Sequence, residues 1–271
     1  MTSSLDAKPL FITNPLIMRI VFIGAGNLAT NLAEALIRAG HDVLQVYSRT
    51  ADSADAFGDA YECSAFTDIN KIRCDADAYI FALKDDALVG VATQLAERVN
   101  DKLFVHTAGS MPMDVLPVEH RGVLYPMQTF SKKRITDFKH IPTFIEASTD
   151  ADLQTLRQLA ESITDRVTEM SSADRVYLHL GAVFCCNFTN RMYALAEKML
   201  EEHGIPFEVM LPLIKETSRK VEKMSPRKAQ TGPAIRWDEN VIQKHLEMLD
   251  SEVDMKQIYS MLSENIHKEY M

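Results

Sequence analysis

The stretch IVFIGAGNLATNLAEAL, residues 20–36, decides the fold. Its apolar run IVFI is followed by the small-residue sequence GAGNLA, residues 24–29, and then by apolar residues at helical spacing. This pattern predicts a strand that turns into a helix through a glycine corner. Gly24 permits the tight turn, Gly26 lets the backbone approach a ligand, and Ala29 lets the helix and the strand pack closely.

The corner has the spacing G-x-G-x-x-A, which is typical of dinucleotide-binding sites. The helix begins near Asn27 and Leu28 and offers free backbone N–H groups and a positive dipole end, to which a pyrophosphate binds. The motif alone is weak evidence, but here it follows a strand, opens a helix and starts an alternating unit. A tight strand–helix turn that holds no ligand is the alternative.

The stretch VYSRT, residues 46–50, stands where the adenosine ribose of a dinucleotide is recognised. An NAD site usually places an acidic residue about 20 residues beyond the glycine motif. Ser48, Arg49 and Thr50 instead offer hydroxyl donors and a planar guanidinium, which bind a 2′-phosphate that an acid would repel. The second strand therefore predicts NADP as the cofactor, with an exposed loop arginine as the alternative.

The composition excludes several classes of function. The chain has 271 residues, a length that favours two domains, and its 46% hydrophobic and 25% charged residues are those of a soluble globular protein. The net charge of −9, without long basic runs, disfavours nucleic acid and anionic membranes as partners. No apolar run approaches the roughly 18 residues of a bilayer span. Four cysteines without a CxxC pair favour a reducing cytoplasm and argue against a zinc site.

Short apolar runs alternate with helical patterns as far as residue 170. This alternation predicts the α/β class, with a doubly wound parallel sheet of seven or eight strands covered on both faces. The expected strands are 19–23, 42–47, 78–83, 103–106, 122–125, 141–146 and 166–170, and the clearest helices are 28–39, 87–99 and 150–163.

The pattern changes at residue 171, after which only helices are expected. We predict residues 1–17 as a loose N-terminal extension, not a signal peptide, or as the product of an upstream start codon. Residues 18–170 are expected to bind the dinucleotide, and 171–271 to form a helical domain for substrate binding or dimerisation. The apolar middle of its first helix predicts burial on several sides, which favours a homodimer. The expected helices are 172–203, 206–224, 237–250 and 255–269.

GAGNLA and SRT resemble the NADP-binding half of the pyrroline-5-carboxylate reductases and of the wider 6-phosphogluconate-dehydrogenase-like group. YPMQTFS (125–131), HLGAVFCCNF (179–188) and TGPA (231–234) resemble a bacterial family of Rossmann-like NADP oxidoreductases with a C-terminal domain of unknown function, number 2520. The resemblance covers about residues 18–268. It implies an N-terminal Rossmann domain followed by an all-helical, dimerising C-terminal domain.

Two features of these relatives are not present in this sequence. The late proline–glycine–glycine–threonine loop of the reductases is replaced by QTGPA, residues 230–234. The lysine–asparagine pair of the hydroxyacid dehydrogenases, at a spacing of four residues, is absent from the long helix at 172–203. The resemblance therefore implies a fold and a cofactor without naming a substrate.

Ligands of open α/β sheets lie beyond the carboxyl ends of the strands. The resemblance places Leu83 and Lys84 near the nicotinamide ribose, with a solvated strand-end lysine as the alternative for Lys84. His106 ends the next strand and either titrates near neutrality or makes a structural hydrogen bond. Further candidates for contacts with the nicotinamide amide or the substrate are Thr107, Ser110 and Gln128.

His179 interrupts an apolar helix, where an imidazole costs free energy unless it is hydrogen-bonded. It is the first candidate for a proton donor, ahead of Lys84 and His106, and a histidine of the core or of a dimer interface is the alternative. Asn187 falls about 12 Å along the helix and some 80° around it, so both side chains can line one elongated pocket. The remaining substrate candidates are Thr231, Gly232 and Arg236, whose guanidinium can clamp a carboxylate.

These features predict an oxidoreductase that transfers a hydride between NADPH and a small molecule with a C=O or C=N bond. The second hypothesis is an NADP-binding sensor or scaffold without turnover. The replaced proline–glycine–glycine–threonine loop and the absent lysine–asparagine pair favour it. A DNA-binding regulator is disfavoured by the acidic balance.

Overall fold

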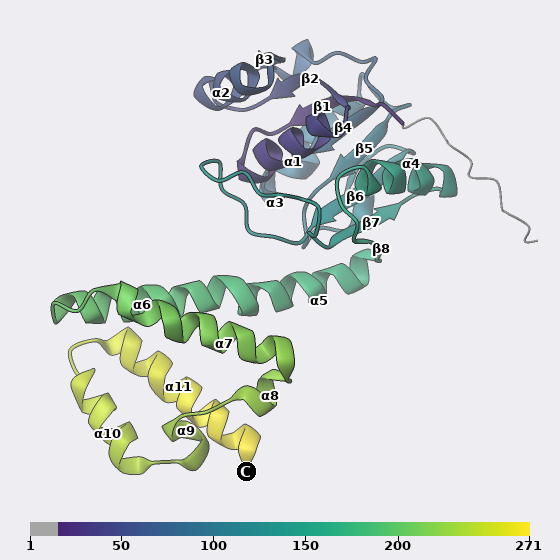
Figure 1. Cartoon of the computed structure of the whole chain (residues 1–271). Coiled ribbons are helices and arrows are strands. Elements are labelled where there is room, and N and C mark those ends of the chain that lie inside the picture. The colour runs from purple at the N-terminus through teal and green to yellow at the C-terminus, as the bar shows by residue number, and fades with distance from the viewer. Residues whose placement is uncertain (1–15) are drawn as a thin grey trace, which may run out of the picture. The chain divides into compact units, whose positions relative to one another are not determined.

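The computed structural model describes residues 16–271 (Figure 1). The predicted extension, 1–17, lies almost wholly outside the described residues. The chain divides into two compact units, one that ends at Cys186 and one that runs from Asn187 to Met271. The domain boundary expected at residue 171 stays a prediction.

The first unit is built on an eight-stranded sheet with the order β3-β2-β1-β4-β5-β6-β7-β8. The predicted α/β class and the doubly wound arrangement are confirmed. One neighbouring pair, β6 and β7, is antiparallel rather than parallel. A parallel pair needs a crossover, usually a helix, whereas no helix lies between these two strands and the chain simply reverses. The strands are β1 (Arg19–Ile23), β2 (Asp42–Tyr47), β3 (Ser64–Phe66), β4 (Ala78–Phe81), β5 (Leu103–His106), β6 (Arg121–Pro126), β7 (Thr143–Ala147) and β8 (Val167–Glu169).

Helices bury apolar residues on both faces of this sheet. Leu32 of α1 and Leu156 of α4 belong to the core on one face, and Phe57 of α2 joins them. Leu88 and Leu95 of α3 belong to the core on the other face. The small helix α2 and the short strand β3, which the sequence patterns did not predict, complete the region beside β2. The bounds are α1 (Asn27–Arg38), α2 (Ala51–Tyr61), α3 (Asp85–Ala96) and α4 (Asp150–Glu161).

Helix α5 (Ser172–Ala182) is fixed to β7 by a buried ion pair. Arg175 is 1% exposed, and its guanidinium donates to Glu146 at 2.7 Å and to the carbonyl oxygen of Met111 at 2.6 Å. The Ser172 hydroxyl donates to the same Glu146 oxygen at 2.6 Å. Burial by itself raises the pKa of Glu146, but hydrogen bonds from Ser172 and Arg175 outweigh it and leave the pKa below its usual value. The carboxylate is therefore ionised against Arg175.

The long apolar helix is more exposed than its sequence predicts. Tyr177 is 75% exposed and Leu180 is 52% exposed, so the expectation of a helix buried on several sides is wrong for the chain by itself. Helical residues continue from α5 through a π-helical turn, Val183–Phe188, into α6 (Thr189–Glu202). A π turn bonds residue i to i+5, so the 80° separation of His179 and Asn187, which assumes 3.6 residues per turn, does not hold.

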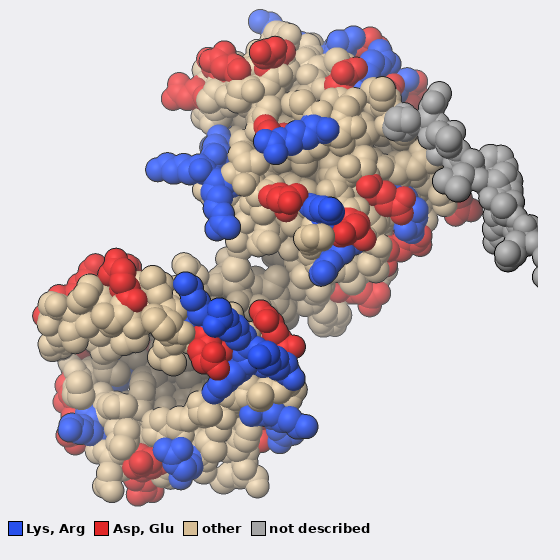
Figure 2. Space-filling view, viewed as in Figure 1, with Lys and Arg blue, Asp and Glu red and all other residues tan. Residues whose placement is uncertain are grey.

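The described residues of the second unit form helices joined by loops, with no strand among them. Figure 2 shows Lys and Arg side chains gathered along α7 and α8, so the acidic chain carries a local basic strip. Trp237 adopts a left-handed backbone conformation (φ 48°) and stacks on His267 with ring centroids 4.7 Å apart. No helix in residues 16–271 combines the length and apolar character that a bilayer span requires. The helices after α6 are α7 (Leu211–Lys223), α8 (Pro226–Ala229), α9 (Pro233–Arg236), α10 (Glu239–Met248) and α11 (Val253–Tyr270).

The ion pair of α5 leads to a stability prediction. Arg175→Met leaves the Glu146 carboxylate without its partner, and breaking a buried pair in this way costs roughly 3–5 kcal/mol of unfolding free energy. Urea unfolding at neutral pH measures the loss. Arg157→Met is the matched control, because the Arg157–Glu169 pair is partly exposed and such pairs contribute about 0–1 kcal/mol. Equal losses in the two variants would show that the buried pair does not anchor α5.

Candidate active site

The glycine corner is sterically required at Gly24. Its φ of +114° lies in the region that only glycine adopts readily, and a Cβ there would overlap the carbonyl oxygen of Ala82 in the loop after β4. The Gly24 N–H donates to the carbonyl oxygen of Tyr47 at 2.7 Å. This residue therefore joins the ends of β1, β2 and β4 at one edge of the sheet.

Gly26 leaves open space in front of helix α1. Its backbone is extended (φ −82°, ψ −174°), and a Cβ built there meets no atom within 4 Å. No side chain caps the first turn of α1, which begins with Asn27 and Leu28, and Ala29 is fully buried against the sheet. Uncapped N–H groups facing open space fit a pyrophosphate, as an N-terminal helix site requires.

The end of β2 supplies the second part of the site. Ser48 is buried, and its N–H donates to the carbonyl oxygen of Phe66 at 3.0 Å. Arg49 and Thr50 are exposed, and the Arg49 guanidinium makes no ion pair or hydrogen bond within the described residues. A cation without an internal partner, beside a hydroxyl at the start of α2, fits the 2′-phosphate of NADP.

The loop after β4 lies against the corner. Leu83 is half-buried, and its side chain is among the nearest neighbours of Gly24. Lys84 is exposed at the N-cap position of α3 and forms no ion pair in the described chain. Leu83 is thus held at the predicted edge, while the Lys84 ammonium is solvated.

The two hydroxyls after β5 already have partners within the fold. Thr107 donates to the carbonyl oxygen of Phe81 at 3.3 Å, which links the ends of β4 and β5. Ser110 donates to the Asp85 carboxylate at the start of α3. Their hydrogen bonds shape the loop HTAGS, residues 106–110, and a ligand contact has to be made in addition to them or in exchange for them.

His106 is completely buried at the end of β5. Its Nδ1 accepts a hydrogen bond from the Ala108 N–H at 3.2 Å, while Nε2 completes none, although the Pro112 carbonyl lies close enough to raise the pKa slightly. Burial, reinforced by the positive charge of Arg175, lowers the pKa of His106 to about 4. The ring is therefore neutral at physiological pH and shielded from solvent.

His179 contacts the sheet through Tyr125. The Tyr125 hydroxyl lies 3.1 Å from Nδ1 of His179, and the two rings meet edge to face with an interplanar angle of 72°. A Cβ built on Gly109 would lie only 2.6 Å from the same Nδ1 atom. The structure thus brings His179, from α5, to the loop after β5 and to the end of β6.

The other predicted substrate residues are distributed over both units. Gln128 is exposed, and its Oε1 accepts from the Thr129 N–H at 2.9 Å. Asn187, Thr231, Gly232 and Arg236 belong to the second unit, where Gly232 adopts φ +114° before the short helix α9 and the other three are exposed.

Three residues that shape this edge are not among the site residues predicted from the sequence. Tyr125 and Gly109 hold the position of His179, as described above. Asn31 is fully buried and binds the loop after β6, accepting from the Thr136 N–H at 2.8 Å and donating to the Ser131 carbonyl oxygen at 3.0 Å. An asparagine within the apolar stripe of α1 was the available indication for Asn31.

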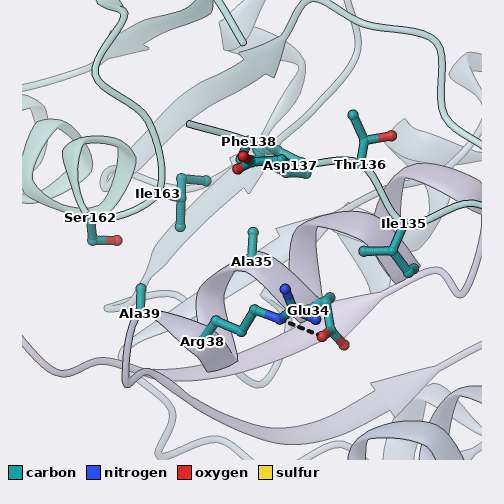
Figure 3. Close-up of a pocket in the computed structure, with 10 residues that line it drawn as sticks. All are labelled: Glu34, Ala35, Arg38, Ala39, Ile135, Thr136, Asp137, Phe138, Ser162 and Ile163. Carbon is teal, nitrogen blue, oxygen red and sulfur yellow. Dashed lines mark hydrogen bonds and ion pairs between the residues drawn. The ribbon is translucent and has the colours of Figure 1, made fainter. Parts of the chain in front are cut away.

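A hollow of about 190 Å³ lies apart from this edge (Figure 3). It is bordered by the last turns of α1, where Arg38 pairs with Glu34 at 2.6 Å, and by Thr136 and Phe138. The glycine corner stands at the other end of α1, roughly 18 Å away for a helix of this length. The described residues contain no cluster of three or more His, Cys, Asp or Glu side chains that could hold a metal ion.

The buried state of His106 predicts a pH dependence of stability. An unfolded histidine, with an ordinary pKa of 6.5, takes up a proton at a pH where the folded ring, with a pKa of about 4, does not. The contribution of the neutral His106 ring to the free energy of unfolding is therefore complete above pH 6.5. It is lost as the pH falls to about 4, a difference of roughly 3 kcal/mol. His106→Asn should flatten this part of the curve of unfolding free energy against pH, measured with urea.

His203→Asn is the control, because His203 is exposed and its side chain forms no hydrogen bond in the described residues. A His106→Asn variant that keeps the wild-type slope between neutral pH and about pH 4.5 would rule out this source of acid sensitivity.

Two family models match the chain. Residues 19–109 match the family described as NADP oxidoreductase coenzyme F420-dependent, and residues 141–266 match the domain of unknown function DUF2520. No curated protein matches the chain.

Solved structures resemble the chain over most of its length. A protein from Bacteroides fragilis, named "putative NADP oxidoreductase", is 51% identical with a TM-score of 0.90 and covers 93% of this chain and 98% of its own. A protein from Thermotoga maritima is 20% identical with a TM-score of 0.69 over the same shares. A pyrroline-5-carboxylate reductase from Coxiella burnetii is 19% identical with a TM-score of 0.56, over 94% of this chain and 99% of its own. The chain belongs to the family of Rossmann-like NADP oxidoreductases with a C-terminal DUF2520 domain.

Proposed function

We propose that this chain binds NADPH along the carboxyl edge of its sheet. The uncapped start of α1 behind Gly26 receives the pyrophosphate, and the exposed Arg49 at the end of β2 receives the 2′-phosphate. Ser48 and Thr50 flank that phosphate. The observation that carries the proposal is the combination of free helix N–H groups and an unpaired cation at the ends of neighbouring strands.

The proposed reaction is hydride transfer between NADPH and a small molecule with a C=O or C=N bond. Bound NADPH supplies the hydride, and the protein orients the substrate and manages the proton. β2 and β4 lie on opposite sides of β1, so an adenosine end at Arg49 directs the other end of the dinucleotide toward β4 and β5. Leu83, the loop 106–110 and His179 belong to that side, and Lys84 borders it.

The substrate candidates of the second unit remain part of this proposal. Arg236 is exposed and forms no ion pair within the described residues, so it is available for a substrate carboxylate. Asn187 and Thr231 offer an amide and a hydroxyl, and the Gly232 turn exposes backbone. We assign residues 171–271 to substrate binding and dimerisation.

We also propose that the protein is a homodimer in a reducing cytoplasm. The apolar side chains exposed on α5, among them Val176, Tyr177 and Leu180, are more than a monomer usually presents on one helix. A second copy of the same chain is the partner that closed symmetry favours. The four cysteines are free, which agrees with a reducing compartment.

The cofactor assignment is tested by Arg49→Ala. Loss of the charge-assisted contacts to the 2′-phosphate should weaken NADPH binding by roughly 10–100-fold, corresponding to about 1.5–3 kcal/mol. NADH lacks that phosphate, so its affinity should not change. Calorimetric titration with each nucleotide measures both affinities. Arg38→Ala, at the other end of α1, is the control. Equal losses of affinity for NADPH and NADH in Arg49→Ala would contradict the assignment of Arg49 to the 2′-phosphate.

Turnover is tested separately from binding. A protein that binds NADPH but oxidises it with none of a broad set of small carbonyl and imine compounds would be the non-catalytic sensor of the second hypothesis. Consumption of NADPH with one class of compound establishes the enzyme.

The dimer proposal is tested by Leu180→Glu. A carboxylate placed in the apolar face of α5 should convert a wild-type dimer into a monomer in sedimentation velocity runs, because an unpaired charge in an interface costs several kcal/mol. Val89→Glu, on an exposed apolar position of α3, is the control and should stay dimeric. A wild-type monomer, or a dimer that Leu180→Glu leaves intact, would contradict the proposal.

A further inference from the structure

Tyr125 and His179 form a hydrogen-bonded pair of titratable side chains at the carboxyl end of β6, with Oη 3.1 Å from Nδ1. Strand register places Tyr125 on the same face of the sheet as His106, because His106 pairs with Val123 and side chains two residues apart point the same way. β6 follows β5 on the side of β1 away from Arg49. The pair therefore lies on the side toward which the reactive end of the dinucleotide is directed.

The loop after β5 is shaped to admit this pair. A side chain at Gly109 would place its Cβ 2.6 Å from Nδ1 of His179 and 2.9 Å from Cε2 of Tyr125. Real Cβ atoms do not approach other atoms so closely, so glycine at this position lets the imidazole lie between the loop and the phenol. One helical turn before His179, the Arg175–Glu146 ion pair fixes α5 on β7. The contact between Tyr125 and His179 is thus fixed on both sides.

The other polar side chains named at this edge are poorly suited to deliver a proton to a substrate. His106 is neutral and fully buried, and its Nδ1 is occupied by the Ala108 N–H. The hydroxyls of Thr107 and Ser110 are engaged within the fold. Lys84 is solvated. Tyr125 is 9% exposed and His179 is half-buried, so this pair combines a shielded donor with a neighbour that solvent reaches.

We infer that Tyr125 is the proton donor of the reaction, that His179 returns the proton to Tyr125, and that the substrate is a carbonyl compound. The inference rests on the proposed function. In it, Tyr125 is a catalytic residue and His179 acts through Tyr125 as a positioning residue.

The step balances with NADPH as the reductant. Hydride addition to the carbonyl carbon moves the π pair of the C=O bond onto oxygen, and this oxygen takes the proton of the Tyr125 hydroxyl. The resulting phenolate takes the proton held on Nδ1 of His179 while Nε2 of the same ring takes a proton from solvent, so the imidazole stays neutral. Exchange with solvent then restores the Nδ1–H tautomer. NADPH is oxidised to NADP⁺, and the carbonyl compound is reduced to an alcohol.

A positioned proton donor indicates that the substrate is a carbonyl compound rather than an iminium ion. An iminium ion already carries its proton, so hydride addition gives a neutral amine and requires no acid. A ketone or aldehyde gives an alkoxide, which must be protonated, and a positioned acid accelerates such a step by about 10²–10⁴-fold. A built proton path therefore serves a C=O bond rather than a protonated C=N bond.

Arg175 of α5 is the charged group that acts on Tyr125. His106 of β5, on the same face of the sheet as Tyr125, is acted on by Arg175, by Glu146 of β7 and by Asp85 of α3. Burial raises the pKa of Tyr125, and the positive charge of Arg175 lowers it by a smaller amount. The phenol consequently keeps its proton across the neutral range, as a donor must.

The tautomer of His179 gives a test that does not depend on turnover. The relay requires the proton on Nδ1, because only then is the Tyr125 hydrogen free to point at the substrate. Long-range ¹H–¹⁵N spectra of the ¹⁵N-histidine-labelled protein with NADPH distinguish the two tautomers. We expect Nδ1–H for His179 in the wild type and a loss of this signature in Gly109→Ala. An Nε2–H tautomer in the wild type would overturn the relay even if the protein is an active reductase.

Single-turnover reduction measures the donor directly, with ethyl pyruvate, benzaldehyde and 1-pyrroline as probes. Tyr125→Phe should lower the rate for the carbonyl probes by about 10²–10⁴-fold and leave NADPH affinity unchanged. Tyr259→Phe is the matched control, because Tyr259 makes the same kind of hydrogen bond to Nδ1 of His245, at 2.8 Å, in the second unit. His179→Gln can still donate a hydrogen bond to Tyr125 but cannot relay a proton, so we expect slower reduction of the carbonyl probes.

The outcomes separate the relay from the proposed function. If NADPH binds and the wild type reduces none of the probes, the proposed function fails and the relay with it. If Tyr125→Phe reduces the carbonyl probes at the wild-type rate, or if the wild type reduces only 1-pyrroline, the relay alone is overturned.

Discussion

The absence of a side chain at Gly24 is the constraint on which the rest of the structure depends. Only because no Cβ stands there does the carbonyl oxygen of Ala82 lie against the turn from β1 into α1. The same turn lets Gly24 bond to the end of β2 at Tyr47. Three strand ends and one uncapped helix N-terminus therefore share one edge, and every polar group proposed for the cofactor projects from it.

The parts of the fold that the sequence predicted are those set by local pattern. β1 and α1 follow from residues 20–36, where period-two and period-3.6 spacing meet at small residues. Arg49 was found in the same way, since its distance from the glycine corner is fixed by one helix and one strand. Short elements with mixed composition, such as α2 and β3, carry too little periodicity to be recognised.

Contacts between distant residues were beyond such reasoning. Tyr125 and His179 are 54 positions apart, and Glu146 and Arg175 are 29 apart, so neither pair leaves a spacing rule in the sequence. The reversal between β6 and β7 depends on a connection without a helix, and the π turn after α5 departs from the 3.6-residue period that sequence patterns assume. His179 was singled out because it is polar in an apolar helix, but its partner could be found only in three dimensions.

The charges around the edge explain why proton chemistry concentrates on one pair. Arg175 is buried and would be costly alone, so Glu146 neutralises it. The remaining field of Arg175, added to burial, keeps His106 neutral. These two effects remove the buried guanidinium and the buried imidazole from proton exchange. The ion pair of Arg175 also holds α5 in place. What remains at the strand ends is a phenol that retains its proton beside an imidazole that solvent reaches, which is the arrangement that a stepwise proton delivery requires.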